Sequence, residues 1–187
     1  MTVGYALTGS FCTFKKSLDA LSEVVAAGHT VIPIMSEAAY TTDTRFGPAS
    51  FYIKALETLT GNSVIHTITE AEPIGPHKLF DVLCVAPCTS NTLAKLALGI
   101  TDTAVTMAVK SHLRNARPVV IGISTNDALG SAAKNIGALM NYRCYYFIPF
   151  SMDDAVNKPR SMVCDFSQTL ATVEAAFKGI EPVQKVF

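Results

Sequence analysis

A buried strand that ends in small polar residues constrains this chain more than any other feature. Residues 81–85 form a mostly apolar run, residues 86–92 gather proline, cysteine, threonine, serine and asparagine, and residues 93–97 resume an apolar spacing. The first N–H groups of a helix lack partners within it, and hydroxyl or amide side chains beside them complete an anion site. The sequence therefore predicts a phosphate-binding junction between a strand and a helix.

The composition fits a compact domain, and we expect residues 1–187 to form a single one. Of the 187 residues, 49% are hydrophobic and 16% are charged, with 15 basic and 15 acidic side chains. This balance gives no excess of basic residues of the kind that binds nucleic acid, so we expect no nucleic-acid partner. Apolar runs stay near strand length and no signal peptide is recognisable, so we expect no membrane span and a cytoplasmic location.

The cysteines are odd in number and show no CxxC spacing. This pattern is typical of reduced, mostly buried thiols in a reducing compartment, and we expect no metal site. The five are Cys12, Cys84, Cys88, Cys144 and Cys164.

Strand and helix patterns alternate along the chain. Apolar runs predict strands over residues 3–7, 31–35, 82–85, 118–123 and 144–148, the last strand, with a weaker one over 63–68. Helical spacing predicts helices over residues 15–27, 49–59, 91–98, 104–114, 131–140 and 167–178. Pro33 indicates an edge or bulged strand, and the two prolines within residues 72–76 predict a loop without regular structure.

This alternation predicts an α/β fold of three layers, Rossmann-like or flavodoxin-like, with a mostly parallel sheet and helices on both faces. Ligands of such folds bind beyond the carboxyl ends of the strands. Each polar residue at a predicted strand end is individually compatible with an ordinary N-cap or turn, but together they outline one crevice. The predicted binding residues are Thr8, Gly9, Ser10, Ser36, Pro87, Cys88, Thr89, Asn91, Ser124, Thr125 and Asn126.

One segment carries a family resemblance. Residues 86–102, APCTSNTLAKLALGITD, resemble the PATANT segment of the FMN-binding flavoproteins that include the cysteine decarboxylases of coenzyme A and lantibiotic synthesis. Residues 8–10 fall where that family has its first phosphate-contacting loop, and Ser36 where it has a hydroxyl after the second strand. The resemblance implies FMN in the crevice and a homo-oligomer, a trimer or larger, because the family builds flavin sites between protomers.

A narrower resemblance runs nearly from end to end. Residues 7–10, 44–47, 71–76, 117–130 and 147–150 resemble the family of dipicolinate synthase B subunits of spore-forming bacteria. It implies an oxidoreductase component in the mother cell that helps to convert a dihydrodipicolinate-level precursor to dipicolinate, pyridine-2,6-dicarboxylate. It also implies a partner, the A subunit of dipicolinate synthase, on which NAD(P) would bind. Two alternatives remain open: a non-catalytic protein that activates this A subunit, and an FMN-dependent decarboxylase.

The sequence departs from the decarboxylase pattern at three places. Pro73 stands where those enzymes carry a catalytic histidine, so His77 is the nearest candidate, against the alternative of a surface histidine. Residues 124–127 replace the family's Pro-x-Met-Asn loop, and Asp127 there would act as a base or cap the next helix. Cys88 replaces an alanine, either as a thiolate favoured beside a helix N-terminus or as a small apolar filler.

The implied substrate sets two further requirements. Its two carboxylates need cationic or N–H partners. Arg45, in a loop rich in glycine and threonine, is predicted to clamp one carboxylate, with Lys54 in the following helix as a second candidate; the alternative for both is a solvated surface charge. Aromatisation also needs a flavin or nicotinamide as hydride acceptor, because side chains alone offer none.

Overall fold

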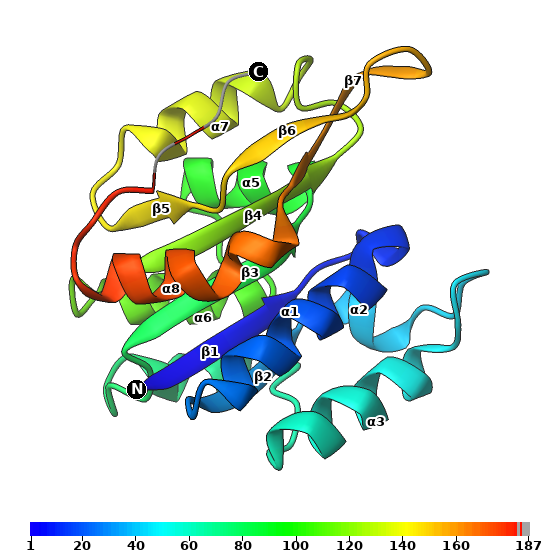
Figure 1. Ribbon diagram of the computed structural model, residues 1–187. Coiled ribbons are helices and arrows are strands. Elements are labelled where there is room, and N and C mark those ends of the chain that lie inside the picture. The colour runs from blue at the N-terminus through cyan, green and yellow to red at the C-terminus, as the bar shows by residue number, and fades with distance from the viewer. Residues whose placement is uncertain (183, 185–187) are drawn as a thin grey trace.

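Five parallel strands form the centre of the molecule (Figure 1). The computed structural model describes residues 1–182 and 184. Within them, the seven-stranded sheet has the order β2-β1-β3-β4-β7-β6, and β5 also pairs with β4. The strands are β1 (Thr2–Leu7), β2 (Thr30–Met35), β3 (Val82–Cys88), β4 (Val119–Thr125), β5 (Tyr145–Phe147), β6 (Phe150–Asp154) and β7 (Lys158–Cys164). The parallel order 2-1-3-4-5 is that of flavodoxin-like folds, which confirms the predicted class.

Helices cover both faces of this sheet (Figure 1). One face packs against α1 (Phe14–Ala26), α2 (Glu37–Thr41), α3 (Ala49–Thr60) and α8 (Thr169–Phe177). The other packs against α4 (Ile68–Ala71), α5 (Ser90–Leu98), α6 (Ala104–Leu113) and α7 (Ala133–Met140). Among residues 1–182 and 184, three short 3-10 helices complete the set: η1 (Phe11–Thr13), η2 (Glu72–Ile74) and η3 (Phe166–Gln168). No helix in the described part of the chain is long and apolar enough to cross a membrane.

The alternation of side chains along β3 explains why the sheet has two cores. Leu83 and Val85 contribute to the cluster under α5 and α6, whereas Val82 and Cys84 contribute to the cluster under α1 and α8. Every residue of β3 is buried, as expected for a central parallel strand. Full burial of each such aliphatic side chain stabilises the fold by about 1.5–3 kcal/mol.

Two details of the sheet fit the sequence closely. Pro33 lies in β2, the first strand of the sheet order, which confirms its predicted edge position. In β1, a Cβ atom added to Gly4 would lie 2.5 Å from the ring of Phe80, so only glycine permits that ring to pack against β1.

The expectations for residues 63–76 are wrong in two respects. The predicted strand over residues 63–68 is reduced to an isolated bridge between Ile65 and Ile34. Thr67 instead begins α4, because its side chain and that of Glu70 form a capping box. The prolines do not exclude regular structure either, since Pro73 lies in the first turn of η2, where a missing N–H costs no hydrogen bond.

The last predicted strand is also not the last one observed. After β5, residues for which no strand is predicted form an antiparallel hairpin of β6 and β7. The hairpin joins the main sheet because Ser124 and Thr125, at the end of β4, pair with Val163 and Met162. Residues 151–153 of β6 and residues 158–160 of β7 are exposed, so these segments lack the apolar pattern by which the other strands were predicted.

Candidate functional site

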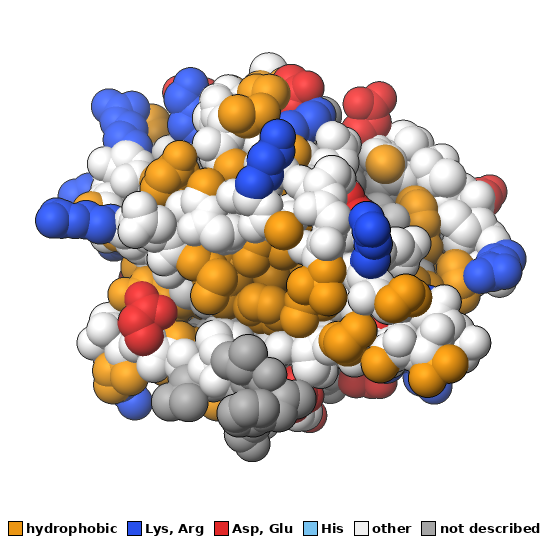
Figure 2. Space-filling model, turned by 90° about the horizontal axis from the view of Figure 1, so that it is seen from above, with side chains coloured by type: hydrophobic (Ala, Val, Ile, Leu, Met, Phe, Trp, Pro, Cys, Tyr) orange, Lys and Arg blue, Asp and Glu red, His pale blue; other side chains and the backbone are white. Residues whose placement is uncertain are grey.

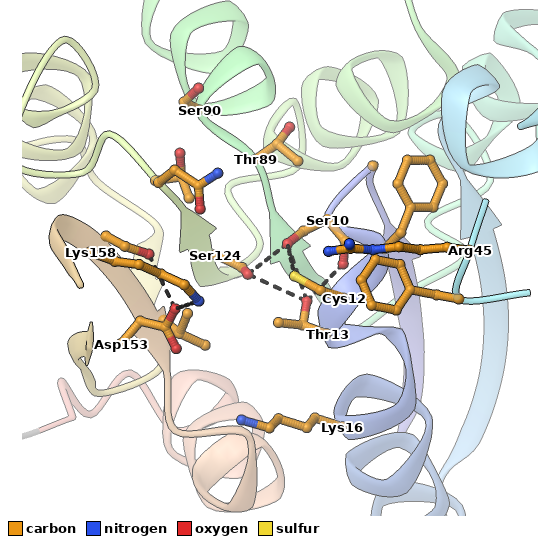
Figure 3. Close-up of a pocket in the computed structure, with 17 residues that line it drawn as sticks. Ser10, Cys12, Thr13, Lys16, Arg45, Thr89, Ser90, Ser124, Asp153 and Lys158 are labelled. Carbon is orange, nitrogen blue, oxygen red and sulfur yellow. Dashed lines mark hydrogen bonds and ion pairs between the residues drawn. The ribbon is translucent and has the colours of Figure 1, made fainter.

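A cavity of about 450 Å³ opens at the carboxyl ends of the parallel strands (Figure 3). This volume lies within the range of about 300–1,000 Å³ typical of small-molecule sites. Its wall includes residues that follow β1, β3 and β4. The chain leaves β1 toward α1 on one face of the sheet and leaves β3 toward α5 on the other. Neighbouring strands whose helices lie on opposite faces form a topological switch point, where ligands of such folds bind.

Seven of the predicted residues line this cavity together. Gly9 and Ser10 come from the loop after β1, Thr89 from the loop after β3, and Ser124, Thr125 and Asn126 from the end of β4; Arg45 reaches it from the loop between α2 and α3. The structure therefore brings together segments that are more than a hundred residues apart in the sequence, as the parallel topology predicts.

Thr8 connects the loop after β1 to the loop after β3 through hydrogen bonds. Its hydroxyl donates to the Pro87 carbonyl at 2.9 Å and accepts from the Thr89 N–H at 3.0 Å. The Thr8 N–H also donates to the Pro87 carbonyl, at 3.2 Å. Thr8 is buried, so these bonds are shielded from water and hold the loop after β1 against the loop after β3.

Three hydroxyl groups form a cluster at the cavity floor (Figure 3). The Ser10 and Ser124 hydroxyls lie 2.7 Å apart, and Thr13 Oγ1 lies 3.3 Å from each and donates to the Ser10 carbonyl at 2.9 Å. Each hydroxyl has one proton. Thr13 uses its proton on the Ser10 carbonyl and one proton joins the two serines, so the remaining serine proton is directed either to Thr13 Oγ1 or to a ligand.

The start of α5 adds backbone donors. Thr89 is the N-cap, and its side chain accepts from the Thr92 N–H at 3.4 Å. Ser90, the first residue of α5, lines the cavity. The first N–H groups of a helix have no partner within it and carry partial positive charge, so this end of the cavity favours an anion.

Neither the packing around Gly9 nor its backbone conformation requires a glycine at this position. An added Cβ atom would meet only the Phe11 ring at 3.6 Å and the Ala38 Cβ atom at 3.9 Å, which are ordinary contacts. Gly9 is also not among the residues with positive φ. A glycine that neither packing nor backbone conformation requires fits a close approach of a ligand to the chain.

The loop that carries Arg45 is held in place by its own bonds. Thr44 and Gly47 form a bridge with backbone bonds of 3.0 and 3.1 Å, and the Tyr52 hydroxyl donates to the Phe46 carbonyl at 2.6 Å. The Arg45 guanidinium lies 4.9 Å from the centre of the Phe46 ring. Among the described residues no acidic side chain pairs with Arg45, so its charge is available to an anion in the cavity.

The β6–β7 hairpin supplies a wall that sequence reasoning missed. Asp153 and Lys158 form an ion pair of 2.6 Å there, and Ser161 and Val163 lie beside them. Lys16, from the first turn of α1, faces the same space in Figure 3. The exposed hairpin gave no periodic signal, but its close spacing of polar residues around residues 153–158 could have suggested a turn.

Four other predicted binding residues stay near the cavity without lining it. Ser36 caps α2, and its N–H donates to the Leu7 carbonyl at 3.0 Å, which places it beside the end of β1. Asn91 is exposed in the first turn of α5. Pro87 and Cys88 are buried in β3, and burial raises the pKa of the Cys88 thiol, so Cys88 packs as an apolar filler.

The structure does not bring the other candidates to the cavity. His77 is exposed in the segment that leads into the amino end of β3, at the opposite edge of the sheet. Lys54 lines a separate hollow on α3. Asp127 accepts from the Thr125 hydroxyl at 2.6 Å and from that of Ser131, bonds that lower its pKa; its carboxylate fixes the turn before α7 and does not cap the helix.

Comparisons with known proteins agree with this architecture. Residues 1–181 match the family model described as Flavoprotein. The chain is 43% identical to the B subunit of dipicolinate synthase from Bacillus subtilis over 97% of its own length and 92% of that protein. A crystal structure of the B subunit from Bacillus halodurans superposes with a TM-score of 0.89 and 39% identity, covering 100% of this chain and 97% of that one.

More distant structures share the fold alone. The FMN-dependent cysteine decarboxylase SpaF superposes with a TM-score of 0.68 at 20% identity, covering 94% of this chain and 97% of SpaF. The long match to the two Bacillus proteins is of a different order, because it combines high identity with nearly complete coverage of both partners. The chain therefore belongs to the Flavoprotein family and, within it, to the dipicolinate synthase B subunits.

Proposed function

We propose that this chain binds FMN in the cavity at the carboxyl edge of the sheet and, together with the A subunit of dipicolinate synthase, oxidises a dihydrodipicolinate-level precursor to dipicolinate during sporulation. One observation carries the proposal. Neutral hydrogen-bond donors at the ends of β1, β3 and β4 line one cavity together with Arg45, which has no acidic partner among the described residues. The chain that holds this cavity is a member of the dipicolinate synthase B family. Neutral donors suit a phosphate and a polar ring, and cations suit carboxylates.

The residues present fit FMN at the phosphate end. Gly9 leaves room beside the backbone, Ser10 and Thr89 offer hydroxyls, and the N–H groups at the start of α5 favour the phosphate charge. Residues 124–126 line the cavity beside Ser10, where the flavin ring would continue from the phosphate end. When bound, FMN would supply a two-electron hydride acceptor, while the chain positions the substrate and excludes water.

The substrate's carboxylates would find their partner in Arg45. Its loop is fixed by the Thr44–Gly47 bridge and by Tyr52, so little side-chain entropy beyond that of Arg45 itself is lost on binding. A guanidinium can donate two parallel hydrogen bonds to one carboxylate, which also orients the ring.

Neither alternative gains support from the cavity. A decarboxylase would need a base at the missing histidine, but Pro73 lies in η2 and His77 lies at the other edge of the sheet. A non-catalytic partner would have no use for a cavity with an unpaired cation and spare donors.

A spectral titration tests the proposal. Purified protein is mixed with FMN, and the flavin absorption band is followed; we expect a perturbed band and a saturable affinity. Dipicolinate formation is then assayed with NAD(P) and the A subunit present, with either protein on its own as control. We expect activity only when both proteins are present. An unperturbed FMN spectrum, or full activity of the A subunit in the absence of this chain, would overturn the proposal.

We also propose a homo-oligomer. Figure 2 shows hydrophobic side chains gathered on the end of the molecule where α7 and β6 lie, and Met140 and Met152 on these elements are 47% and 41% exposed. Contiguous exposed apolar surface of this kind is typical of interaction sites. Light scattering of the purified chain should give a mass of at least three protomers, and a monomer would contradict this.

A further inference from the structure

The proposed reaction needs a proton acceptor as well as a hydride acceptor. A dihydropyridine becomes aromatic when one ring atom loses a hydride and a neighbouring ring atom loses a proton. The hydride carries two electrons to a bound flavin or nicotinamide, and the electron pair of the proton-losing bond stays in the ring. The proton must pass to a base within hydrogen-bond reach, and in this chain such a base would stand in the cavity wall.

The wall of the cavity contains a single carboxylate in the part of the chain that the structure describes. That residue is Asp153, and no histidine stands beside it. The sequence-based candidates are otherwise engaged, because Asp127 holds the turn before α7 and His77 lies elsewhere. We infer that Asp153 is the general base that accepts the ring proton, an inference that rests on the proposed function.

The backbone of the hairpin directs Asp153 toward the cavity. The pairing of β6 with β7 shifts register between Met152 and Asp154, so Asp153 lies at a bulge. Bulges re-aim side chains and are frequent beside active sites. In Figure 3 the Asp153 side chain lies across the cavity from the hydroxyl cluster of Ser10, Thr13 and Ser124.

Two neighbours on β7 orient the carboxylate. Lys158 Nζ donates to Asp153 Oδ2 at 2.6 Å, and the buried Ser161 hydroxyl lies 3.5 Å from the same oxygen. Both contacts use one oxygen, which leaves Oδ1 for a substrate proton. The Asp153 side chain is 28% exposed, so it is accessible yet shielded on one side.

A second cavity gives the proton a way out. It has a volume of about 520 Å³ and shares Lys16, Asp153 and Val163 with the first, so Asp153 lies at their junction. Its wall carries further carboxylates that could relay a proton to solvent. The charged groups around Asp153 on the elements packed against it are Lys16, Asp19, Glu23, Arg45, Lys158 and Asp165.

The first experiment measures proton uptake when dipicolinate binds. A dianionic ring beside Asp153 favours the protonated carboxyl, so binding should draw a proton from the buffer. Calorimetry of the FMN-loaded protein in two buffers of different ionisation enthalpy reports this uptake without any turnover. We expect uptake in the wild type, none in Asp153→Asn, and unchanged uptake in Asp154→Asn.

Asp154 is a matched control because it is the adjacent carboxylate of the same strand. Asp154 accepts from the Val156 and Asn157 N–H groups at 3.1 and 2.9 Å, and an asparagine oxygen can keep both bonds. Equal uptake in the wild type and in Asp153→Asn would overturn the inference.

The second experiment compares turnover rates in the presence of the A subunit. Asp153→Asn should lower kcat by about 100-fold or more, with KM changed by less than about threefold, and should remove the acidic limb of the pH–rate profile. Asp154→Asn, the control introduced above, should keep the wild-type kcat. If Asp153→Asn and Asp154→Asn have equal kcat values, Asp153 is not the base. Failure of the wild type to bind FMN would instead refute the proposed function itself.

Discussion

The hydroxyl of Thr8 accepts a hydrogen bond from the N–H of Thr89 at 3.0 Å and so joins the loops that follow β1 and β3. These loops carry Gly9, Ser10 and Thr89, three of the residues that line the cavity. A short buried side chain therefore sets the spacing between the two halves of the proposed phosphate site.

Replacing this hydroxyl should cost stability. Thr8→Val keeps the shape of the side chain but leaves the Thr89 N–H without its acceptor, and an unsatisfied buried donor costs about 1–3 kcal/mol. Thr8→Ser keeps the hydroxyl and should stay closer to the wild type. Urea unfolding followed by circular dichroism measures the free energy of unfolding of all three proteins. Equal stability of the valine and serine variants would mean that the bond contributes nothing.

Gly9→Ala should separate ligand binding from folding. The added methyl group meets no atom closer than 3.6 Å, so the midpoint of thermal unfolding should stay near that of the wild type. In the proposed phosphate site the same methyl group would displace the ligand, and FMN affinity should fall by about tenfold or more. Gly4→Ala is the matched control, because its Cβ would lie 2.5 Å from Phe80 and should destabilise the fold. Unchanged FMN affinity of Gly9→Ala would remove Gly9 from the site.

Arg45→Ala should raise the KM for the substrate while changing the free energy of unfolding little. Loss of a charge-assisted hydrogen bond of about 1.5–3 kcal/mol corresponds to an increase in KM of about 10-fold to 160-fold. Lys54→Ala removes a similar charge from α3, away from the cavity, and should leave KM unchanged. Steady-state kinetics in the presence of the A subunit measure both. A KM that Arg45→Ala leaves at its wild-type value would contradict the carboxylate clamp.

His112 should make the fold sensitive to acid. Burial lowers the pKa of His112 to about 4, with the Arg117 charge acting in the same direction and the hydrogen bond to the Pro118 carbonyl opposing it. In the unfolded chain the imidazole has a pKa of about 6.5, so between these pH values the unfolded state binds more protons. The free energy of unfolding should therefore fall as the pH drops from about 6.5 to about 4, by roughly 3 kcal/mol from this group.

The substitution His112→Gln tests this expectation. A glutamine can still donate to the Pro118 carbonyl, which His112 Nε2 contacts at 3.0 Å, but it does not titrate. Denaturant unfolding at several pH values should show a shallower acid dependence in this variant than in the wild type. His77→Gln, at an exposed position, should keep the wild-type slope, and identical slopes for all three proteins would contradict the prediction.

Most of the parallel core could be predicted from the sequence. Buried strands such as β3 are continuous apolar runs, and the helices between them repeat apolar residues at helical spacing. Both patterns can therefore be recognised from the local sequence alone. The convergence of residues 8–10, Thr89 and residues 124–126 follows from parallel topology, because carboxyl ends of parallel strands share one edge.

The hairpin and its contribution to the cavity could not be predicted. The middle of β6 and the first half of β7 are exposed, so the pairing of these strands depends on backbone bonds and on contact with the end of β4. No local sequence pattern indicates such a contact. Asp153 and Lys158 were missed for this reason. Lys54 and His77 were assigned to the cavity because they are close in sequence to other candidate residues. In the structure Lys54 lies on α3 and His77 lies in the segment before β3, both away from the cavity.

The antiparallel hairpin divides the cavity wall into two kinds of surface. The donors at the ends of β1, β3 and β4 are tied to the buried sheet, so few changes there leave the fold intact. Asp153 and Lys158 sit instead near the exposed tip of the hairpin, whereas Phe150 and Cys164 at its other end pack against the core. An engineer could exchange this hairpin tip for one with different charges and so redirect the same scaffold to another small molecule, while the proposed phosphate half of the pocket stays untouched.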